Sequence, residues 1–240
     1  MALYLYGVVR ASRLPERLAR QGLRVLSSRG LGALVAAADD SPLRASRRNL
    51  LAHADVVEDA FGWTTVLPMR FGVVLPGAAA VRELVLDANR ELLEELLERH
   101  QSTAELSLKA SYDEDAVMAE LVAGSSRLAS LRKAYRSSPT VERGMLLGEA
   151  VAAEFGARRD RDAATILEAL RPVALDLRAS DVDLAGEVVR LALLVERDRV
   201  DELDRRVEEL SADLSPPVRF KLVGPLPPYS FVDVPLAVPA

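Results

Sequence analysis

The residues that could do chemistry in this chain are few and widely spaced. The two histidines, His53 and His100, are 47 positions apart, and there is no cysteine to serve as a nucleophile or thiolate ligand. A zinc or iron site needs several such ligands close together. We therefore expect both histidines to be structural. We place His53 at the margin of a helix's apolar face and His100 at a helix C-terminus, where the dipole favours its charged form.

Common catalytic and phosphate-binding motifs are absent from the sequence. It contains no Gly-x-Ser-x-Gly, Gly-x-x-x-x-Gly-Lys or Gly-x-Gly-x-x-Gly pattern. The acidic residues 113–115 fit the first turn of a helix, where carboxylates oppose the dipole. The mixed charges of residues 158–162 fit a solvated helix face. We therefore expect no catalytic residue, cofactor or metal ligand, and no enzyme activity.

One apolar stretch, residues 64–76, organises the chain. It reads Thr-Thr-Val-Leu-Pro-Met-Arg-Phe-Gly-Val-Val-Leu-Pro, and it predicts a buried strand that kinks and then leaves the sheet. Its lone charge, Arg70, would cost on the order of several kcal/mol if it were buried without a partner. Arg70 therefore either emerges at the end of the strand or pairs with a carboxylate. Glu58 and Asp59 are the nearest in sequence, and such an ion pair is favoured over a catalytic arginine.

A second stretch of this kind, residues 224–232, lies near the end of the chain. Its sequence is Gly-Pro-Leu-Pro-Pro-Tyr-Ser-Phe-Val, in which the prolines remove backbone donors and favour polyproline II geometry. Tyr229 and Phe231 still favour burial. The segment is either a C-terminal strap packed over the chain's own body, which physics alone favours, or a rigid aromatic surface offered to a partner.

The elements that must position these stretches form two series. The first is predicted to contain a strand, a hairpin that turns at Arg29-Gly30, a helix that begins after Ser46 and ends at Gly62, the organising strand, and a long amphipathic helix ending near His100. These elements are expected at residues 3–10, 23–28, 31–38, 46–62, 64–76 and 77–100. The stripe of the long helix is expected to comprise Val81, Leu84, Val85, Ala88, Leu92 and Leu96.

The second series begins with an alternating strand at residues 103–112. A mostly helical section follows to residue 171, with interruptions near 124–126 and 137–139, and Ser138 is expected to cap the helix after the second one. Strands are predicted at 172–178, 188–196 and 218–223, with a helix capped by Asp198 before the last strand. When the helical section is counted as one crossover, the order is βαββαβ.

The resulting fold class is α+β with two domains. The N-terminal α+β domain is predicted to span residues 1–101. The C-terminal domain, residues 102–240, is predicted to be ferredoxin-like (βαββαβ), with an extended helical insertion and a proline-rich C-terminal strap and tail.

Composition narrows the class of protein further. The chain has 240 residues, of which 50% are apolar and 28% charged, as in a folded globular protein. A formal net charge of -5 argues against a nucleic-acid partner. No stretch reaches the ~18 uninterrupted apolar residues of a membrane span, so no lipid membrane partner is expected. The lack of cysteine and of a signal peptide at the N-terminus favours a cytoplasmic location.

Three motifs, in the same order along the chain, resemble the GvpF/GvpL family of gas vesicle proteins. They are the opening Leu-Tyr-Leu-Tyr-Gly-Val-Val at residues 3–9, Val-Leu-Pro-Met-Arg-Phe-Gly at residues 66–72, and the proline-rich stretch at residues 224–232. Weaker similarity around His53, Glu105 and residues 193–197 spreads the match over nearly the whole chain. One departure is Leu226, where many members of the family carry tryptophan.

The resemblance implies a non-enzymatic structural protein or assembly factor of the gas vesicle, a protein-walled organelle that provides buoyancy. It also implies two α+β domains, the second a modified ferredoxin-like one. The expected partners are the hydrophobic gas vesicle wall protein and other gas vesicle accessory proteins. The residues expected to bind them are Pro68, Arg70, Phe71, Gly72, Pro227, Pro228, Tyr229 and Phe231. The alternative is a ferredoxin-like regulatory module that binds a small molecule between its helices and its sheet.

Overall fold

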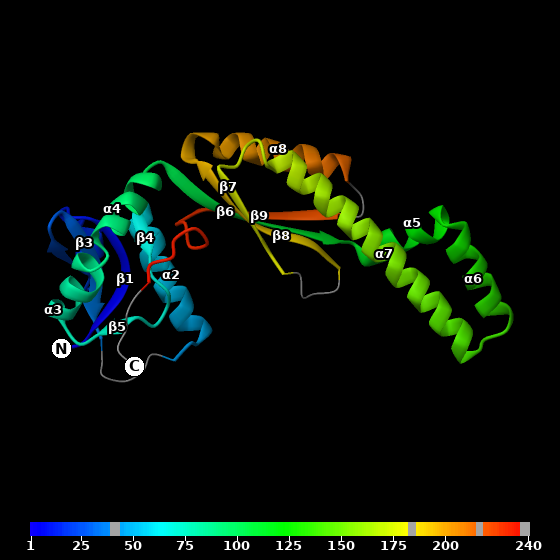
Figure 1. Cartoon of the computed structure of the whole chain (residues 1–240), viewed down its shortest axis with the longest axis horizontal. Coiled ribbons are helices and arrows are strands. Elements are labelled where there is room, and N and C mark those ends of the chain that lie inside the picture. Colours follow the sequence, from blue (N-terminus) through cyan, green and yellow to red (C-terminus); the bar gives the residue numbers. More distant parts are fainter. Residues whose placement is uncertain (39–43, 182–185, 215–217, 236–240) are drawn as a thin grey trace. The chain divides into compact units, whose positions relative to one another are not determined.

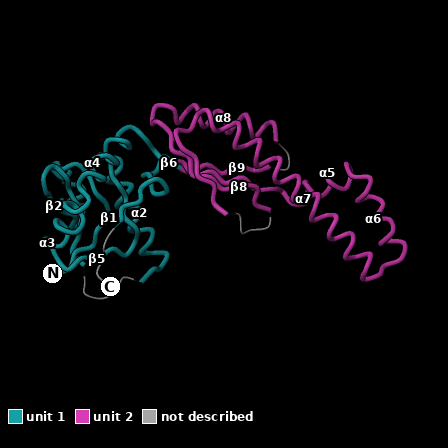
Figure 2. The backbone as a smooth tube through the Cα atoms, in the orientation of Figure 1, with its two compact units in different colours: residues 1–105, 224–240 teal, residues 106–223 magenta. Residues whose placement is uncertain are grey.

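The structure is a computed structural model that describes residues 1–38, 44–181, 186–214 and 218–235. The chain forms two compact units (Figures 1 and 2), and each is described by itself below. Unit 1 comprises residues 1–105 and 224–240, and unit 2 comprises residues 106–223. The predicted turn at residues 39–42 lies outside the described residues.

Unit 1 is built on an antiparallel sheet with the strand order β2-β3-β1-β4, in which β5 also pairs with β1. The hairpin predicted around Arg29-Gly30 is confirmed, and both residues have positive φ, 45° and 90°. The strands are β1 (Leu3–Arg10), β2 (Arg24–Ser28), β3 (Leu31–Ala37), β4 (Val66–Pro68) and β5 (Val74–Leu75).

Helices cover both faces of this sheet, which explains why β1 and β3 are buried along most of their length. On one face, Leu5 and Val35 pack with apolar residues of two helical segments, η1 (Val81–Asp87) and α4 (Arg90–Arg99). On the other face, Val9 and Leu34 pack with α1 (Glu16–Ala19) and α2 (Arg47–Phe61). The sheet is therefore the middle layer of three.

The organising stretch, residues 64–76, forms two short strands where one was predicted. β4 pairs with one part of β1, the chain bulges out at residues 69–73, and β5 then returns to pair with Leu3 and Tyr4 of the same strand. The predicted kink is confirmed, and the chain leaves the sheet after Leu75, but the prediction missed the short return strand β5. Gly7 permits the close approach of β4, because a Cβ at this position would lie 2.7 Å from Val66 Cγ2 and 2.8 Å from Leu67 O.

The long helix predicted after Pro76 is interrupted. A short helix, α3 (Ala78–Ala80), continues into the π-helical η1 and then into α4 after a turn at Ala88 and Asn89. A π-helix contains an extra residue per turn, so it shifts the apolar stripe by one position. Val81, Val85 and Leu96 of the predicted stripe are buried, and Leu84 and Leu92 are partly buried. Ala88 is exposed, and the residues that the prediction missed are Leu86, Leu93 and Leu97.

Unit 2 contains a sheet with the strand order β7-β8-β6-β9 and two helices, α7 and α8, whose apolar residues pack against it (Figure 1). The strands are β6 (Thr103–Tyr112), β7 (Asp176–Ser180), β8 (Glu187–Glu196) and β9 (Val218–Leu226). The helices are α5 (Glu114–Gly124), α6 (Ser126–Ser137), α7 (Val141–Leu170) and α8 (Val200–Asp213). The apolar face of α8 consists of Leu203, Val207 and Leu210, which are buried, and Val200, which is partly buried.

Two predicted helix caps are wrong. Thr140, not Ser138, caps α7 by accepting a hydrogen bond from the backbone N–H of Arg143 at 3.3 Å. Asp198 lies in a 3-10 turn, η2 (Arg197–Arg199), and makes no cap hydrogen bond to α8. Both errors have the same cause. A helix can begin one or two residues earlier or later than its sequence pattern indicates, and this shift decides which polar side chain becomes the cap.

The structure confirms a mixed helical and sheet protein with antiparallel strand pairs. The boundary between the two units falls inside β6, at residues 105 and 106, and the chain rejoins unit 1 within β9. Residues 224–235 therefore group with unit 1, whereas the sequence placed them with residues 102–240. The division into domains 1–101 and 102–240 stays a prediction.

Candidate interaction surface

The loop between β4 and β5, residues 69–73, projects from the edge of the sheet of unit 1. Its two ends are fixed to β1 by backbone hydrogen bonds, from Met69 N to Tyr6 O at 2.9 Å and from Leu5 N to Val73 O at 3.0 Å. Gly72 has φ +92°, a conformation that other residues adopt at a cost. The sequence thus builds a short, defined loop at this edge; we call residues 69–73 the edge loop.

A hydrogen-bond chain behind the edge loop holds it in place. The backbone N–H of Gly72 donates to the hydroxyl of Tyr4 at 3.0 Å, and this hydroxyl lies 2.9 Å from Nδ1 of His53. The other ring nitrogen of His53, Nε2, lies 3.1 Å from the carbonyl oxygen of Met69. Because Met69 O can only accept, Nε2 carries the proton and Nδ1 accepts from Tyr4. The neutral imidazole therefore links α2, β1 and both ends of the turn.

Aromatic rings surround His53. The ring of Tyr6 stacks on the imidazole, with centroids 5.4 Å apart and an interplanar angle of 18°. The ring of Phe71 meets His53 edge-on at 5.8 Å and Tyr4 at 6.2 Å. Such contacts add roughly 0.5–1.5 kcal/mol per pair to the free energy of unfolding. Phe71 thus has an inner face that packs on this cluster and an outer part that remains accessible.

Protonation states agree with a structural role for this cluster. Burial lowers the pKa of His53, although its hydrogen bond to Met69 O acts in the opposite direction. Burial also raises the pKa of Tyr4 and of Tyr6. All three side chains are therefore neutral near pH 7, and their hydrogen bonds are used to hold the backbone. His53 lies on α2, as expected, but it is more deeply buried than the expected place at the margin of the apolar face, with 6% of it exposed.

Arg70 is the exposed tip of the edge loop. Its side chain is 89% exposed, and its guanidinium lies 3.5 Å from the carboxylate of Asp233, which is 84% exposed. Exposed pairs of this kind contribute roughly 0–1 kcal/mol. Both expected outcomes occur, because Arg70 is exposed and also meets a carboxylate, but the partner is Asp233 and not Glu58 or Asp59. The reason is that the loop turns Arg70 away from α2.

The C-terminal segment is attached to unit 1 by a buried carboxylate. Glu105 accepts hydrogen bonds from the backbone N–H of Ser230 at 2.6 Å and from its hydroxyl at 2.7 Å. Phe231 is only 7% exposed, and Val232 packs against the apolar cluster that η1 and α4 cover. Burial and the nearby carboxylates, Glu58 and Glu105, raise the pKa of Tyr229. The segment is therefore held by both polar and apolar contacts.

The edge loop and the C-terminal segment line one pocket. Its volume is ≈ 350 Å³, and its walls are Pro68, Met69, Arg70, Val73, Val232, Asp233, Val234 and Pro235. Most of the lining residues are apolar, but the surface that they expose is as polar as it is apolar, and it includes the charged residues Arg70 and Asp233. A pocket thus lies beside residues 68–73, and the chain's own C-terminal segment forms one of its sides.

The residues predicted to bind a partner fall into two groups. Four of them, Pro68, Pro227, Pro228 and Phe231, are buried. The other four are accessible: Arg70, Gly72 and Tyr229 are exposed, and Phe71 is half-buried. The first group supports the segments, and the second group forms the surface available for contact. Their role in binding stays a prediction.

The sequence did not predict the residues that hold the edge loop and the C-terminal segment in place. Tyr4 and Tyr6 lie two positions apart on β1 and so share a face of the strand, a signal that could have paired them with the helix carrying His53. Glu105 precedes the alternating part of β6 and is buried among its neighbours. Its partner, Ser230, lies 125 positions further along the chain, and no local pattern indicates such a contact.

His100 corrects a second expectation. It is 2% exposed at the end of α4, and its Nδ1 lies 3.1 Å from the hydroxyl of Thr103. Burial, with a smaller contribution from the charge of Arg99, lowers the pKa of His100. The expectation that the helix dipole favours the charged form is wrong, because desolvation outweighs the dipole here.

Two searches cover the rest of the described chain. In residues 1–38, 44–181, 186–214 and 218–235, no three His, Cys, Asp or Glu side chains gather as metal ligands. Within the same ranges no helix combines the length and the apolar character needed to cross a bilayer. Two pockets described in unit 2 lie between helices, one at α5 and α6 and one at α7 and α8.

Comparison with known proteins gives a match over almost the whole chain. Residues 2–233 match the model of the family described as gas vesicle synthesis protein GvpL/GvpF. A gas vesicle protein F from Streptomyces sp. (strain CB03234) is 37% identical over 242 residues, which cover 97% of this chain and 100% of that protein. A gas vesicle protein F from Nostoc sp. (strain PCC 7120) is 25% identical over 240 residues, 97% of this chain and 98% of the relative.

Solved structures show the same fold. The crystal structure of the gas vesicle protein GvpF from Anabaena sp. PCC7120 superposes with a TM-score of 0.84 at 24% identity, covering 98% of this chain and 99% of the other. The corresponding protein from Microcystis aeruginosa gives a TM-score of 0.77 at 24% identity, covering 97% and 99%. At this identity the structural likeness supports the fold alone.

Proposed function

The chain belongs to the GvpL/GvpF family of gas vesicle synthesis proteins, and from that premise we propose that it is a non-enzymatic structural or assembly protein of the gas vesicle. In this role it is a minor shell component or accessory factor that contacts the hydrophobic wall protein while the vesicle forms. Its place in the cell is the cytoplasm and the gas vesicle, and other gas vesicle accessory proteins are further partners.

The observation that carries this proposal is the edge loop with its fixed backing. Tyr4 and His53 hold the loop from inside, and Arg70 and Gly72 face solvent at its tip. A loop held in one conformation loses little entropy when a partner binds. The adjoining pocket of ≈ 350 Å³, most of whose lining residues are apolar, offers a place for an aliphatic side chain of the wall protein.

The proposal meets a physical need of vesicle assembly. A wall subunit that forms apolar, strand-rich sheets is an aggregation hazard before it is incorporated, because its strand edges are open to other copies. A protein with a net charge of -5 stays in solution, and a defined loop at its sheet edge can bind an open strand edge of the wall subunit. The four accessible residues of the surface, Arg70, Phe71, Gly72 and Tyr229, are the proposed contacts.

Two finer features of the fold belong to the same proposal. The order β6, helical section, β7, β8, α8, β9 supports a ferredoxin-like second domain with an extended helical insertion. The hydrogen bonds from Ser230 to Glu105 and the burial of Phe231 support a C-terminal strap. In the proposed arrangement this strap completes the binding surface beside the edge loop.

The decisive experiment deletes the gene in a vesicle-forming strain and restores it as wild type or as a variant. We expect loss of buoyant vesicles on deletion and recovery with the wild-type gene. An Arg70→Glu/Tyr229→Asp variant should capture less wall protein in co-purification, and a thermal melt establishes that it folds, because Tyr229 is only 36% exposed and lies near Glu58 and Glu105. The matched control is Arg24→Glu/Tyr135→Asp, which makes the same changes at exposed positions elsewhere.

Phe71→Asp tests the half-buried contact and needs a thermal melt beside it, since this ring also packs on His53. Vesicles that form normally without the gene would refute the assembly role. Equal capture of the wall protein by wild type and by the folded Arg70→Glu/Tyr229→Asp variant would refute the assigned surface.

A further inference from the structure

The helix α6 carries positive charge only. Between Glu120 and Glu142 the chain has four cations and no carboxylate side chain, although the whole chain has a net charge of -5. The four cations are Arg127, Arg132, Lys133 and Arg136. A local excess of one sign on a chain of the opposite sign directs an oppositely charged partner to that place.

These cations have no ion-pair partner among the described residues. Some arginines on other helices are paired, as in Arg90–Glu94 on α4 and Arg158–Asp162 on α7. Within the part of the chain that the structure describes, Arg136 lies in the last turn of α6, where it opposes the helix dipole, and no carboxylate pairs with the charges of this helix.

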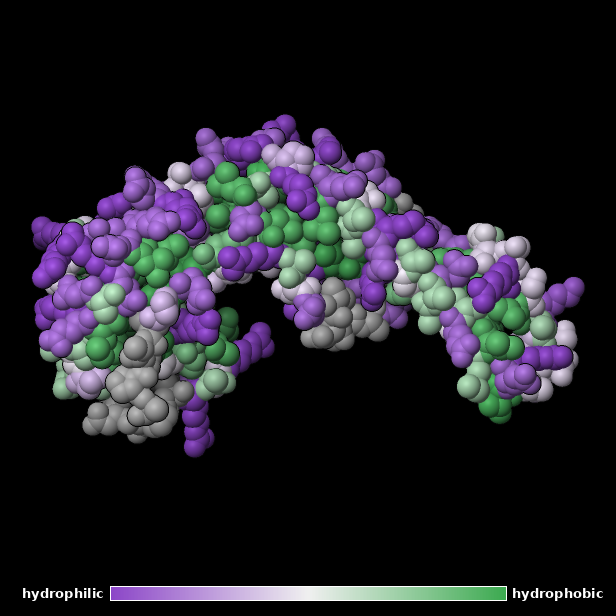
Figure 3. Space-filling view, viewed as in Figure 1, coloured by the Kyte–Doolittle hydropathy of each residue, from purple (hydrophilic) through white to green (hydrophobic). Residues whose placement is uncertain are grey.

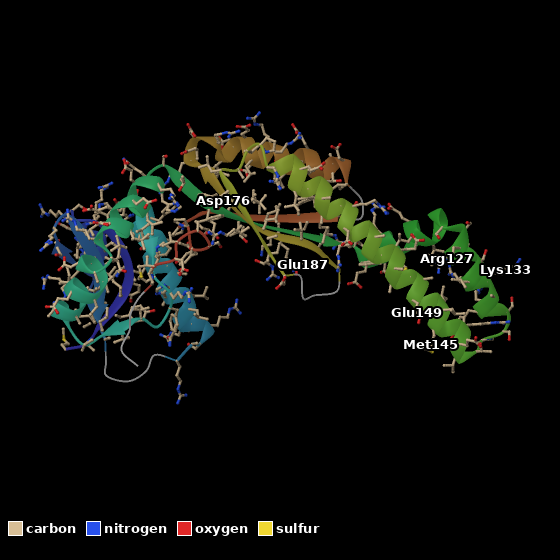
Figure 4. All side chains as sticks on the ribbon, in the orientation of Figure 1. Arg127, Lys133, Met145, Glu149, Asp176 and Glu187 are labelled. Atoms are coloured by element: carbon tan, nitrogen blue, oxygen red, sulfur yellow. The ribbon has the colours of Figure 1, made fainter. Side chains whose placement is uncertain are left out.

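Three of the cations share one face of α6. Ala129, Arg132, Lys133 and Arg136 follow the i, i+3, i+4, i+7 spacing that places side chains on one side of a helix. They line a groove of ≈ 410 Å³ together with Ser137 and, from α5, Val122. We call Arg132, Lys133 and Arg136 the basic face. Arg127 does not line the groove and lies about 120° around the helix from Lys133 (Figure 4).

Two of the groove's lining residues are apolar, and the groove lies near exposed apolar side chains. The two are Val122, which is half-buried, and Ala129, which is exposed. At the adjoining end of α6 and α7, Val141 is 82% exposed and Met145 is 60% exposed. Figure 3 shows apolar surface at this end of the helical section. Apolar area left in water represents roughly 25 cal/mol per Å² that a partner could recover by covering it.

We propose that the groove between α5 and α6 binds an acidic, amphipathic segment of another polypeptide. Carboxylates of the segment pair with the basic face, and its aliphatic side chains cover Val122 and Ala129 and extend toward the exposed start of α7. This inference goes beyond the proposed function, because it assigns a second surface, in unit 2, that does not involve the edge loop.

The chemistry of the groove favours an acidic polypeptide over other polyanions. No aromatic side chain lines the groove to stack on a nucleobase. The four cations of α6 only reach the lower limit of the cluster of four to eight that marks an anionic membrane site, and Arg127 does not line the groove. A groove lined by cations and by small apolar side chains is the complement of a helix that presents both acidic and aliphatic side chains.

The test measures binding of a fluorescent helical peptide built from glutamate and leucine heptads, with a peptide carrying lysine in place of glutamate as the opposite probe. The key variant is Arg132→Glu/Lys133→Glu/Arg136→Glu. The matched control, Arg10→Glu/Arg13→Glu/Arg24→Glu, reverses the same charge at exposed positions of unit 1. Thermal melts establish that both variants fold.

We expect the wild type to bind the acidic peptide and not the basic one, with affinity falling as salt increases. The key variant should bind at least about tenfold more weakly, the sum of three exposed ion pairs, and the control should bind like wild type. If both variants bound the acidic peptide equally weakly, the binding would depend on the net charge of the protein and not on the basic face, and the inference would be overturned. Absence of binding by the wild type would overturn it as well.

Other occupants give their own signatures. A wild type that dimerises in sedimentation velocity, while the key variant stays monomeric, assigns the groove to a second copy and refutes the inference. Binding of phosphatidylglycerol vesicles or single-stranded DNA without binding of the acidic peptide refutes it too.

A photo-crosslinking residue at position 133 then identifies the natural segment in cells, with position 24 as the control site. A crosslinked segment that is acidic and comes from another protein supports the inference, and a segment of another character refutes it. These results stand apart from the deletion experiment, because vesicles that form without the gene would refute the proposed function and leave the peptide result unchanged.

Discussion

The hydroxyl of Tyr4 lies 2.9 Å from Nδ1 of His53, and this contact is the centre of the chain that fixes the edge loop. On one side the hydroxyl accepts the backbone N–H of Gly72, and on the other side of the imidazole Nε2 donates to Met69 O. The arrangement needs a neutral histidine with its proton on Nε2. Three elements that are distant in sequence thus meet at one ring.

Replacing Tyr4 by phenylalanine should destabilise the protein. The change keeps the ring but removes the hydroxyl, so Gly72 N–H and His53 Nδ1 lose their partner. We expect the free energy of unfolding to fall by about 1–3 kcal/mol, the usual penalty for unsatisfied polar groups away from water. Urea denaturation measures it. Tyr6→Phe is the control, because no hydrogen bond of its hydroxyl is found among the described residues; an equal loss in both variants would contradict the prediction.

The same ring makes stability depend on pH. Burial lowers the pKa of His53 and of His100 in the folded chain, below the ordinary value of about 6.5. Below that pH the unfolded chain binds more protons than the folded chain. The stability is therefore fully present above about pH 6.5 and falls as the pH drops toward the folded pKa values, by at most about 1.4 kcal/mol per pH unit for each histidine.

Urea midpoints between about pH 7.5 and about pH 5.5, above the range where carboxylates titrate, measure this slope. His53→Gln should reduce the slope, and His100→Gln should reduce it further when both changes are combined. A slope that does not change in either variant would show that neither histidine is responsible.

The attachment of the C-terminal segment depends on one carboxylate. Glu105→Gln removes the charge that accepts two hydrogen bonds from Ser230, and hydrogen bonds to charged groups contribute about 1.5–3 kcal/mol each. We expect amide hydrogen exchange of residues 230–234 to accelerate by about tenfold or more. Glu98→Gln, at an exposed position of α4, is the matched control and should leave the exchange unchanged.

A buried carboxylate on α7, Asp162, should contribute strongly to the stability of unit 2. Asp162 is 6% exposed and accepts hydrogen bonds from the hydroxyl of Tyr112 at 2.8 Å and from Nε of Arg158 at 2.7 Å. Asp162→Ala leaves both donors without this partner, and breaking a buried pair costs about 3–5 kcal/mol. We expect a loss toward the lower end, because Arg158 is partly exposed. Asp160→Ala, at an exposed position of the same helix, should change the midpoint of chemical denaturation little.

These networks also mark the limit of what the sequence predicts. Strands with apolar or alternating residues, such as 3–10 and 103–112, and the helix from Ser46 to Gly62 are local patterns, and the structure confirms them. Arg70 and Glu105 find their partners 163 and 125 positions away, so nothing near them in sequence indicates the contacts. The π-helix of η1 similarly shifts the stripe to Leu93 and Leu97, because packing against the sheet overrides helical periodicity.

The division into domains can be tested by removing the C-terminal segment. Residues 224–235 group with unit 1, where Phe231 is buried and Val232 and Val234 pack against the apolar cluster of η1 and α4. A chain that ends at Val223 should therefore lose stability in unit 1 by several kcal/mol, since truncating one buried phenylalanine alone costs about 3–5 kcal/mol. Hydrogen exchange should accelerate in β1 and α4, while β8 and α8 of unit 2 keep their protection. If β8 and α8 lost protection equally, the two units would be one cooperative body, and the predicted boundary at residues 101 and 102 would have no meaning for folding.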